Sequence, residues 1–353
     1  MLLPILDTLR QRMSWSNAKT VLRQTGLDIG QGWQKTIKKL LNREDEIDVA
    51  RLELWLVEHI LCGEKFTKIY PMTDGDRERL HHFFSSLVVA QAPATEAYPA
   101  MLTQEVIDVA EQDFSVVRVE SNEDGIGLVL SSIFAMKVRE EIEFDEFEDP
   151  AEMRSKFDEI VGVKFRKVQL FHVIWVPHHR PQLEIRVDCL PGMPEAAIHA
   201  HHSRLREIIN ETGATHLTVP INLFPAVRAF YDDDEDGIVS EITFSTTTSA
   251  IKNEKMIKRS REKLDQRKET YHLGGKDALS TDIRLFRITV DWPKEEDGAI
   301  FVPSITLAAT GPSGRGGSAD PVISGAFVGN CIRAADYEFV IERLGRKAGL
   351  AEK

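Results

Sequence analysis

The segment Gln182–Leu190 reads QLEIRVDCL and has the most regular alternation in the chain. Leu183, Ile185 and Val187 fall on one side, and the charged residues between them fall on the other. A period of two residues is the pattern of a β-strand. A strand with one apolar and one polar face is typical of an antiparallel sheet that exposes one side to water. We therefore expect an antiparallel sheet here, with its charged face in solvent.

The neighbouring segments extend this sheet and flank it with helices. Lys164–Val176 is rich in β-branched and aromatic residues, which favours a strand. Pro194–Glu211 has helical spacing, with a proline near its first turn and Gly213 just past its end. Strand-like segments continue to residue 328, and Ala334–Lys347 has the pattern of a final helix. Residues 101–353 therefore predict an α+β domain with a mostly antiparallel sheet and flanking helices.

The N-terminal quarter has a different character. Residues 1–90 contain several segments with apolar residues at helical spacing, such as Glu46–Leu61. Thr73 with Asp76 three residues later resembles a capping box at the start of another helix. Residues 91–100 are rich in alanine and proline and have no periodicity. We predict an all-helical bundle at 1–90, a linker at 91–100 and the sheet domain at 101–353, which together make an α+β protein.

Composition narrows the class of protein. The chain has 353 residues, a formal net charge of −12 and only three cysteines, all far apart. No C-x-x-C pair is present, which argues against a disulfide framework or a zinc ribbon. The apolar start is too short for a secretory signal, and no stretch approaches the roughly 20 apolar residues of a membrane span. These observations predict a cytoplasmic protein that does not enter a membrane.

Charge is distributed very unevenly along the chain. Residues 1–43 contain eight basic and two acidic residues, a formal charge of +6, so the remainder carries −18. Within this region, Ser16–Arg43 consists of two helical runs around a glycine-containing turn. An apolar stripe that includes Trp33 and Ile37 lies opposite a face of lysines in the second run. A basic amphipathic helix in an acidic protein indicates an anionic partner, nucleic acid above all.

The two basic runs resemble a helix-turn-helix, in which the second helix enters the major groove. The first helix would contact phosphates, and the second would add cations and an amide that reads base edges. The candidate residues are Lys19, Arg23, Gln34, Lys35, Lys38 and Lys39. The interval from Gly26 to Gly32 is longer than the usual turn of three or four residues. Two other interpretations stay open: a solvated face on a small bundle, and a helical module that binds a protein partner.

A second basic segment lies in the sheet domain. Ile251–Tyr271 is predicted to be a very polar helix with a local charge of +4. A glycine-rich loop at residues 310–320 carries an arginine that suits an anion. The candidate phosphate contacts here are Lys255, Lys258, Arg259, Arg261 and Arg315. The simpler interpretation is a solvated helix with internal ion pairs, together with a long hairpin loop.

No pattern predicts a catalytic centre, a cofactor site or a metal site. The segment Leu273–Ser280 contains a Gly-Lys pair but does not match a P-loop, because Thr270 occupies the position of the first glycine of that motif. The glycine-rich loop at residues 310–320 also lacks the order of that motif. Asp232–Gly237 follows the start of a calcium loop, but Thr243 occupies the position of the bidentate glutamate. His199 and His202 share a helical face without a third ligand at a recognisable spacing. We therefore predict no catalytic residue, no metal and no cofactor.

Taken together, the sequence favours a non-enzymatic protein that binds DNA or RNA by contacting phosphates. The contacts would come from the N-terminal basic helix and from the second basic helix in the α+β domain. The alternative is an interaction or regulatory protein whose N-terminal helical module assembles with itself or with a partner. A third interpretation is an enzyme, which would need a pocket that joins Arg186, Arg315 and a histidine.

Overall fold

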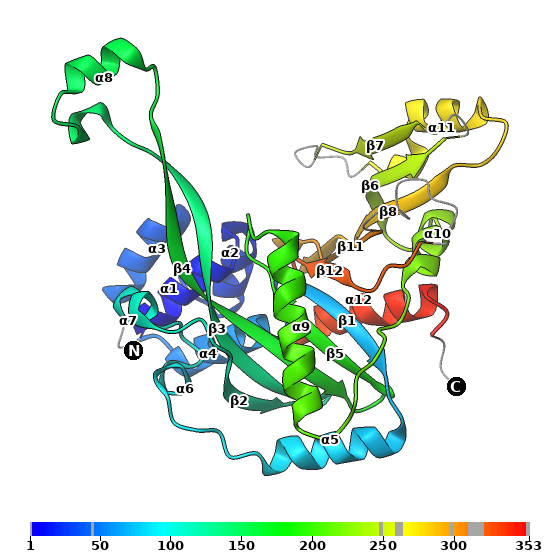
Figure 1. Cartoon of the computed structure of the whole chain (residues 1–353), viewed down its shortest axis with the longest axis horizontal. Coiled ribbons are helices and arrows are strands. Elements are labelled where there is room, and N and C mark those ends of the chain that lie inside the picture. The colour runs from blue at the N-terminus through cyan, green and yellow to red at the C-terminus, as the bar shows by residue number, and fades with distance from the viewer. Residues whose placement is uncertain are drawn as a thin grey trace.

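A single antiparallel sheet runs through the molecule in the computed structural model (Figure 1), which describes residues 2–43, 46–246, 250–257, 264–296, 299–309 and 321–350. Every neighbouring pair of strands in it is antiparallel. The α+β class with a mostly antiparallel sheet is therefore confirmed. From edge to edge, its ten strands are β2 (Ser115–Ser121), β3 (Gly125–Glu141), β4 (Val161–Pro177), β5 (Gln182–Asp188), β1 (Lys65–Pro71), β12 (Ala326–Gly329), β11 (Ser304–Ala308), β8 (Arg284–Asp291), β6 (Ile238–Ser245) and β7 (Ile251–Lys255).

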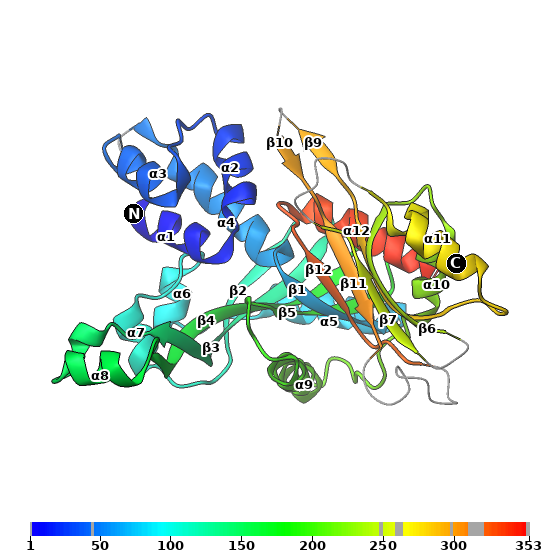
Figure 2. The same ribbon diagram turned by 90° about the horizontal axis from the view of Figure 1, so that it is seen from above.

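The N-terminal helices pack on one face of the sheet. Their apolar side chains form one core with Phe171, Val173 and Trp175 of β4, so the helices do not enclose a core of their own. These helices are α1 (Leu2–Arg12), α2 (Trp15–Gln24), α3 (Gly32–Leu41) and α4 (Val49–Cys62). In Figure 2 they cluster at one end of the molecule, next to a two-stranded hairpin formed by β9 (Lys294–Glu296) and β10 (Ala299–Phe301).

The prediction that residues 1–90 are helical throughout is wrong at β1. This strand pairs with β5 on one side and with β12 on the other, in the middle of the sheet. Phe66, Ile69 and Tyr70 give it aromatic and β-branched side chains that are all buried. The capping box of Thr73 and Asp76 is confirmed at the start of α5 (Asp74–Ser86). The predicted linker contains the short helix α6 (Pro93–Ala97), followed by α7 (Gln104–Val109).

The opposite face of the first five strands is covered by α5 and by α9 (Glu195–Glu211). As a result β5 is buried on both faces, and the prediction that its charged face meets solvent is wrong. The other half of the sheet packs against α10 (Phe224–Asp232) and α12 (Ala334–Lys347). Each face of β5 therefore has its own cover, and its charged side chains require partners inside the protein.

The predicted polar helix at residues 251–271 is also wrong. Ile251–Lys255 is the edge strand β7, which pairs with β6. Among the described residues after β7, helical structure is found at the 3₁₀ turn η3 (Gln266–Lys268) and at α11 (Thr270–Asp277). Residues 258–263 lie outside the described residues. A charged edge strand resists unwanted pairing with other sheets. The lysines of β7 can therefore be explained by the position of this strand at the edge of the sheet.

Strands β3 and β4 are much longer than their neighbours. Their outer ends pair only with each other and carry the 3₁₀ turn η2 (Phe144–Glu146) and the helix α8 (Pro150–Lys156) at the far end. Both views show this hairpin projecting from the sheet (Figures 1 and 2). No helix among the residues that the structure describes is long and apolar enough to span a membrane.

Candidate nucleic-acid interface

The basic residues predicted in the N-terminal region lie together on two neighbouring helices. Helix α2 is capped by Ser14, whose side chain accepts a hydrogen bond from the backbone of Asn17. Helix α3 carries most of the lysines on its outer side. We call the outward side chains of these helices the α2–α3 surface, defined by Lys19, Arg23, Gln34, Lys35, Lys38 and Lys39.

The inner sides of the two helices fix their position. Val21 and Leu22 of α2 are buried, as are Ile37 and Leu40 of α3. The rings of Trp15 and Trp33 meet edge to face, with centroids 5.4 Å apart, and both pack against the core beneath. An edge-to-face aromatic pair adds about 0.5–1.5 kcal/mol beyond its buried area. The apolar stripe predicted from sequence therefore serves to hold the basic face outward.

The turn between the helices is longer than in a standard helix-turn-helix. Helix α2 ends at Gln24 and α3 begins at Gly32. Gly26 and Gly32 both have positive φ angles, which glycine adopts without strain. The backbone N–H of Gly30 donates to the hydroxyl of Thr36 at 2.9 Å and folds the turn back onto α3. The arrangement keeps two adjacent basic helices but departs from the motif in its turn.

The cations of this surface differ in how far they are already paired. Lys39 forms an ion pair with Asp28, and Lys35 donates to Gln31 at 3.5 Å. No ion pair within the described residues engages Lys19, Arg23 or Lys38. Arg23, Lys35 and Lys38 are exposed. A group of exposed cations without acidic partners is available for an anionic ligand.

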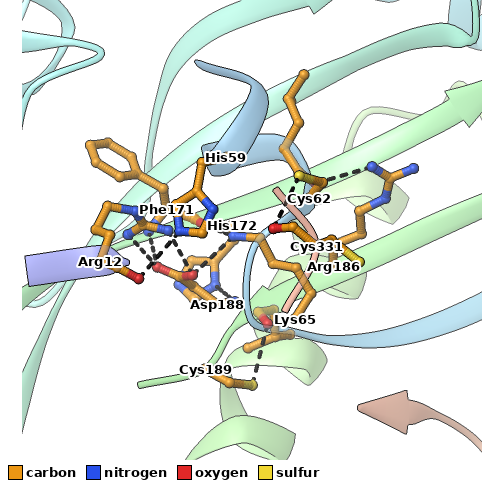
Figure 3. Close-up of polar contacts among 12 residues, drawn as sticks. Arg12, His59, Cys62, Lys65, Phe171, His172, Arg186, Asp188, Cys189 and Cys331 are labelled. Atoms are coloured by element: carbon orange, nitrogen blue, oxygen red, sulfur yellow. Dashed lines mark hydrogen bonds and ion pairs between the residues drawn. The ribbon is translucent and has the colours of Figure 1, made fainter. Parts of the chain in front are cut away.

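A buried ion cluster anchors these helices to the sheet (Figure 3). Arg12, at the end of α1, donates from both terminal nitrogens to the two carboxylate oxygens of Asp188 on β5, at 2.8 and 2.9 Å. Lys65 of β1 donates to the same carboxylate at 2.9 Å and to the carbonyl of Phe171 at 2.8 Å. Bidentate arginine–carboxylate pairs are directional. The end of α1, three residues before the start of α2, is thus held in a set orientation.

The charges in this cluster depend on each other. Burial raises the pKa of Asp188, but the positive charges of Arg12 and Lys65 outweigh burial and hold that pKa well below its usual range. Burial lowers the pKa of Lys65. His59 of α4 donates from Nε2 to the carbonyl of Arg12 at 3.2 Å, and burial together with the nearby Arg12 lowers its pKa to about 4. His59 is therefore neutral near pH 7 and acts as a hydrogen-bond donor.

A second ion cluster lies further along the same face of β5. Glu184 pairs with Arg186 at 2.8 Å, and Glu338 of α12 pairs with both Arg186 and Arg180. Burial raises the pKa of Glu184, but Arg186 and Arg180 outweigh it and leave the pKa lowered. The Arg186 guanidinium also stacks over Tyr337, 4.0 Å from the ring centre. Arg186 is only 2% exposed, because its guanidinium is engaged by these partners inside the protein.

The second set of predicted contacts lies elsewhere. Lys255 is on β7, where its ammonium donates to Glu241 at 2.7 Å and lines a polar pocket with Arg287. In both views β7 and α3 lie on opposite sides of the molecule (Figures 1 and 2). The strand that carries Lys255 therefore lies at the other end of the molecule from α2 and α3. Lys258, Arg259, Arg261 and Arg315 lie outside the described residues.

Other groups considered in the sequence are engaged inside the protein. His202 lies 3.1 Å from the hydroxyl of Tyr70, and burial lowers its pKa to about 3. In the acidic turn before β6, Asp233 pairs with Lys347, and Asp236 pairs with Arg343 at 2.9 Å. Within the described residues, no group of three or more His, Cys, Asp and Glu side chains is placed to hold a metal ion.

The sequence alone does not predict this anchor. Arg12 adds there only to the charge of residues 1–43, and Asp188 belongs to the charged side of Gln182–Leu190, which the alternation places in solvent. The one available signal is the alternation of β5, because a buried strand with charged residues at every second position needs partners. Comparison with protein-family models, with curated proteins and with solved structures gave no match.

Proposed function

We propose that this chain is a non-enzymatic nucleic-acid-binding protein that contacts phosphates through the α2–α3 surface. The observation that carries the proposal is the group of outward cations without acidic partners, Lys19, Arg23 and Lys38, next to Lys35. The T-shaped packing of Trp15 on Trp33 supports it. Those rings pack against the core rather than offering an apolar patch to a protein partner.

The contacts are mainly electrostatic. Lysine acts as a point charge, whereas arginine can read a base edge with two parallel hydrogen bonds. Three of the four cations named above are lysines, so we expect weak sequence preference. Because Lys255 lies on the other side of the molecule and is paired with Glu241, the proposal rests on the N-terminal helices alone.

The test is equilibrium binding of the full chain to a labelled DNA duplex and to a labelled single-stranded RNA. If all four cations contact phosphates, the log–log dependence of affinity on salt has a slope of about −3.6 for the duplex. The variant Lys35→Glu/Lys38→Glu should lose affinity and reduce the size of that slope by about 2. The comparison of DNA with RNA at matched salt identifies the preferred nucleic acid.

The matched control is Arg118→Glu/Arg346→Glu, which makes the same change in net charge on β2 and α12. Both arginines are exposed and lie outside the α2–α3 surface. We expect this control to retain nearly all of the wild-type affinity. If the control and the α2–α3 variant lose affinity equally, or if neither loses any, the α2–α3 surface is not the binding site.

A further inference from the structure

The projecting hairpin of β3 and β4 is covered near its base by α7, where Lys167 donates to the carbonyls of Asp108 and Ala110, whereas its outer residues are largely exposed. Beyond Ser131 in β3 and before Val173 in β4, the two strands pair only with each other. We call residues 133–139 and 161–169 the arm stem, and residues 140–160 the arm tip. A two-stranded ribbon alone is marginally stable in water, so the stem gains stability from any surface that covers it.

One face of the stem is apolar and exposed. Val161, Val163 and Phe165 alternate along β4, so they share a face, and they are 48%, 54% and 72% exposed. Directly opposite them on β3, Val163 faces Arg139 and Phe165 faces Lys137. Val161 faces Glu141, which belongs to the tip. The exposed row therefore combines apolar side chains with cations. Exposed apolar rows bordered by polar residues mark interaction sites.

The charges of the arm are divided between its two parts. The stem contains five basic residues and no acidic one, a formal charge of +5. The tip contains ten acidic and two basic residues, a formal charge of −8. The tip also offers an exposed aromatic ring, because Phe157 is 53% exposed. Stem and tip are thus complementary in charge, and each has an apolar contact to offer.

We propose that the arm is a dimerisation element, in which the stem of one copy of this chain is covered by the tip of a second copy. Two arms that lie antiparallel make the stem-to-tip contact twice, which is the reciprocal interface of a two-fold dimer. Within one copy, the described contacts between tip and stem lie at their junction, where Glu140 pairs with Lys164, because both parts belong to the same ribbon. The apolar row is buried in the contact, and the opposed charges fix the direction in which the arms align.

Nucleic acid is an alternative ligand for the stem, because the stem is rich in basic residues. The ten acids of the tip continue the same ribbon and repel a polyanion laid along it. The second copy is therefore favoured, and nucleic acid becomes an outcome of the test. The inference does not depend on the proposed function, because the arm and the α2–α3 surface are different parts of the molecule.

The test is a charge exchange between two variants of the full chain, followed by sedimentation velocity. The stem variant is Lys137→Glu/Arg139→Glu, and the tip variant is Glu148→Lys/Asp158→Lys/Glu159→Lys. All five side chains are exposed. We expect wild type to dimerise, with a dissociation constant that rises as salt increases from about 0.1 to about 0.5 M. Each variant alone should dimerise at least about tenfold more weakly.

An equimolar mixture of the two variants is the decisive sample. It keeps one unaltered contact, between the tip of the stem variant and the stem of the tip variant. Its other contact joins the substituted stem to the substituted tip, so the charges at the altered positions are exchanged between the two partners. We therefore expect the mixture to associate more tightly than either variant alone. The variant Val163→Ser/Phe165→Ser removes the apolar row and should also weaken the wild-type dimer, while circular dichroism checks that each variant is folded.

A wild-type chain that stays monomeric, or a mixture that associates no better than its components, overturns the inference. A stem variant that loses nucleic-acid affinity while wild type stays monomeric assigns the stem to nucleic acid instead. If the arm-dependent dimer forms and no nucleic acid binds, the inference stands and the proposed function fails. The two proposals therefore succeed or fail separately.

Discussion

Two regions of this protein are rich in charge and use it in opposite ways. On β5 the charged side chains are buried, and each cation meets a carboxylate, as Arg12 and Lys65 meet Asp188. On the α2–α3 surface the cations are outward, and cations such as Lys38 have no acidic partner among the described residues. Buried charges must be balanced within the fold because desolvation is costly. Cations without acidic partners are therefore expected at the protein surface, where solvent stabilises them and an anionic ligand can bind them.

The largest expected effect comes from breaking the buried region. Asp188→Ala leaves Arg12 and Lys65 buried without a counter-charge, and we expect the free energy of unfolding to fall by about 3–5 kcal/mol. Chemical denaturation followed by circular dichroism measures the change. The control is Asp7→Ala, which removes the surface ion pair with Arg10 and should cost less than about 1 kcal/mol. Equal losses in the two variants would contradict the comparison.

A smaller effect is expected from pH. The pKa of His59 is about 4 in the folded protein and 6.5 when exposed, so the unfolded chain binds a proton that the folded chain does not. This contribution is complete above pH 6.5 and is lost as the pH falls toward 4, by about 1.4 kcal/mol for each pH unit.

Denaturation at several pH values checks this expectation. The variant His59→Gln keeps an N–H donor for the carbonyl of Arg12 and should weaken the acid dependence. The exposed His216 provides the control, because His216→Gln should leave the dependence as it is in wild type. An acid dependence that His59→Gln does not change would show that His59 is not its source.

The smallest expected effect on stability comes from the outer region. Lys35→Glu/Lys38→Glu, designed to reduce binding, should change the free energy of unfolding by no more than about 0.5 kcal/mol. The side chains are exposed and make no ion pair within the described residues. Denaturant midpoints measured with the Asp188→Ala series check this. A loss above about 2 kcal/mol would mean that these lysines stabilise the fold.

Much of the secondary structure could be predicted from local pattern. Helix α9 and the start of α5 follow from helical spacing, a proline or a capping box, and these depend on neighbouring residues alone. Strand β1 could not be predicted in the same way. It is seven residues long, follows a helix directly and becomes a strand because β5 and β12 pair with it. The polar segment that forms β7 was misassigned for the same reason, since its charges suit either a solvated helix or an edge strand.

The two regions also differ in how far sequence could reveal them. The lysines of α3 lie within a few residues of each other in the chain, so helical spacing alone predicts that they share a face. The partners of Asp188 come from residues 176 and 123 positions away in the chain, and no local pattern links them. The opposite charges of the arm stem and the arm tip can be counted from the sequence, but the pairing of β3 with β4 that makes them one projecting ribbon cannot.

By itself the sequence determined the α+β class, the concentration of positive charge in the first 43 residues and the amphipathic form of α3. These depend on composition and on spacing along one helix or strand. Only the tertiary structure decided that the charges of β5 are buried, that β1 belongs to the sheet and that β7 lies away from the basic helices. Burial and strand pairing depend on contacts between residues that are far apart in the chain. Whether ion pairing offsets the cost of desolvating a charge therefore depends on which residues the tertiary structure brings together.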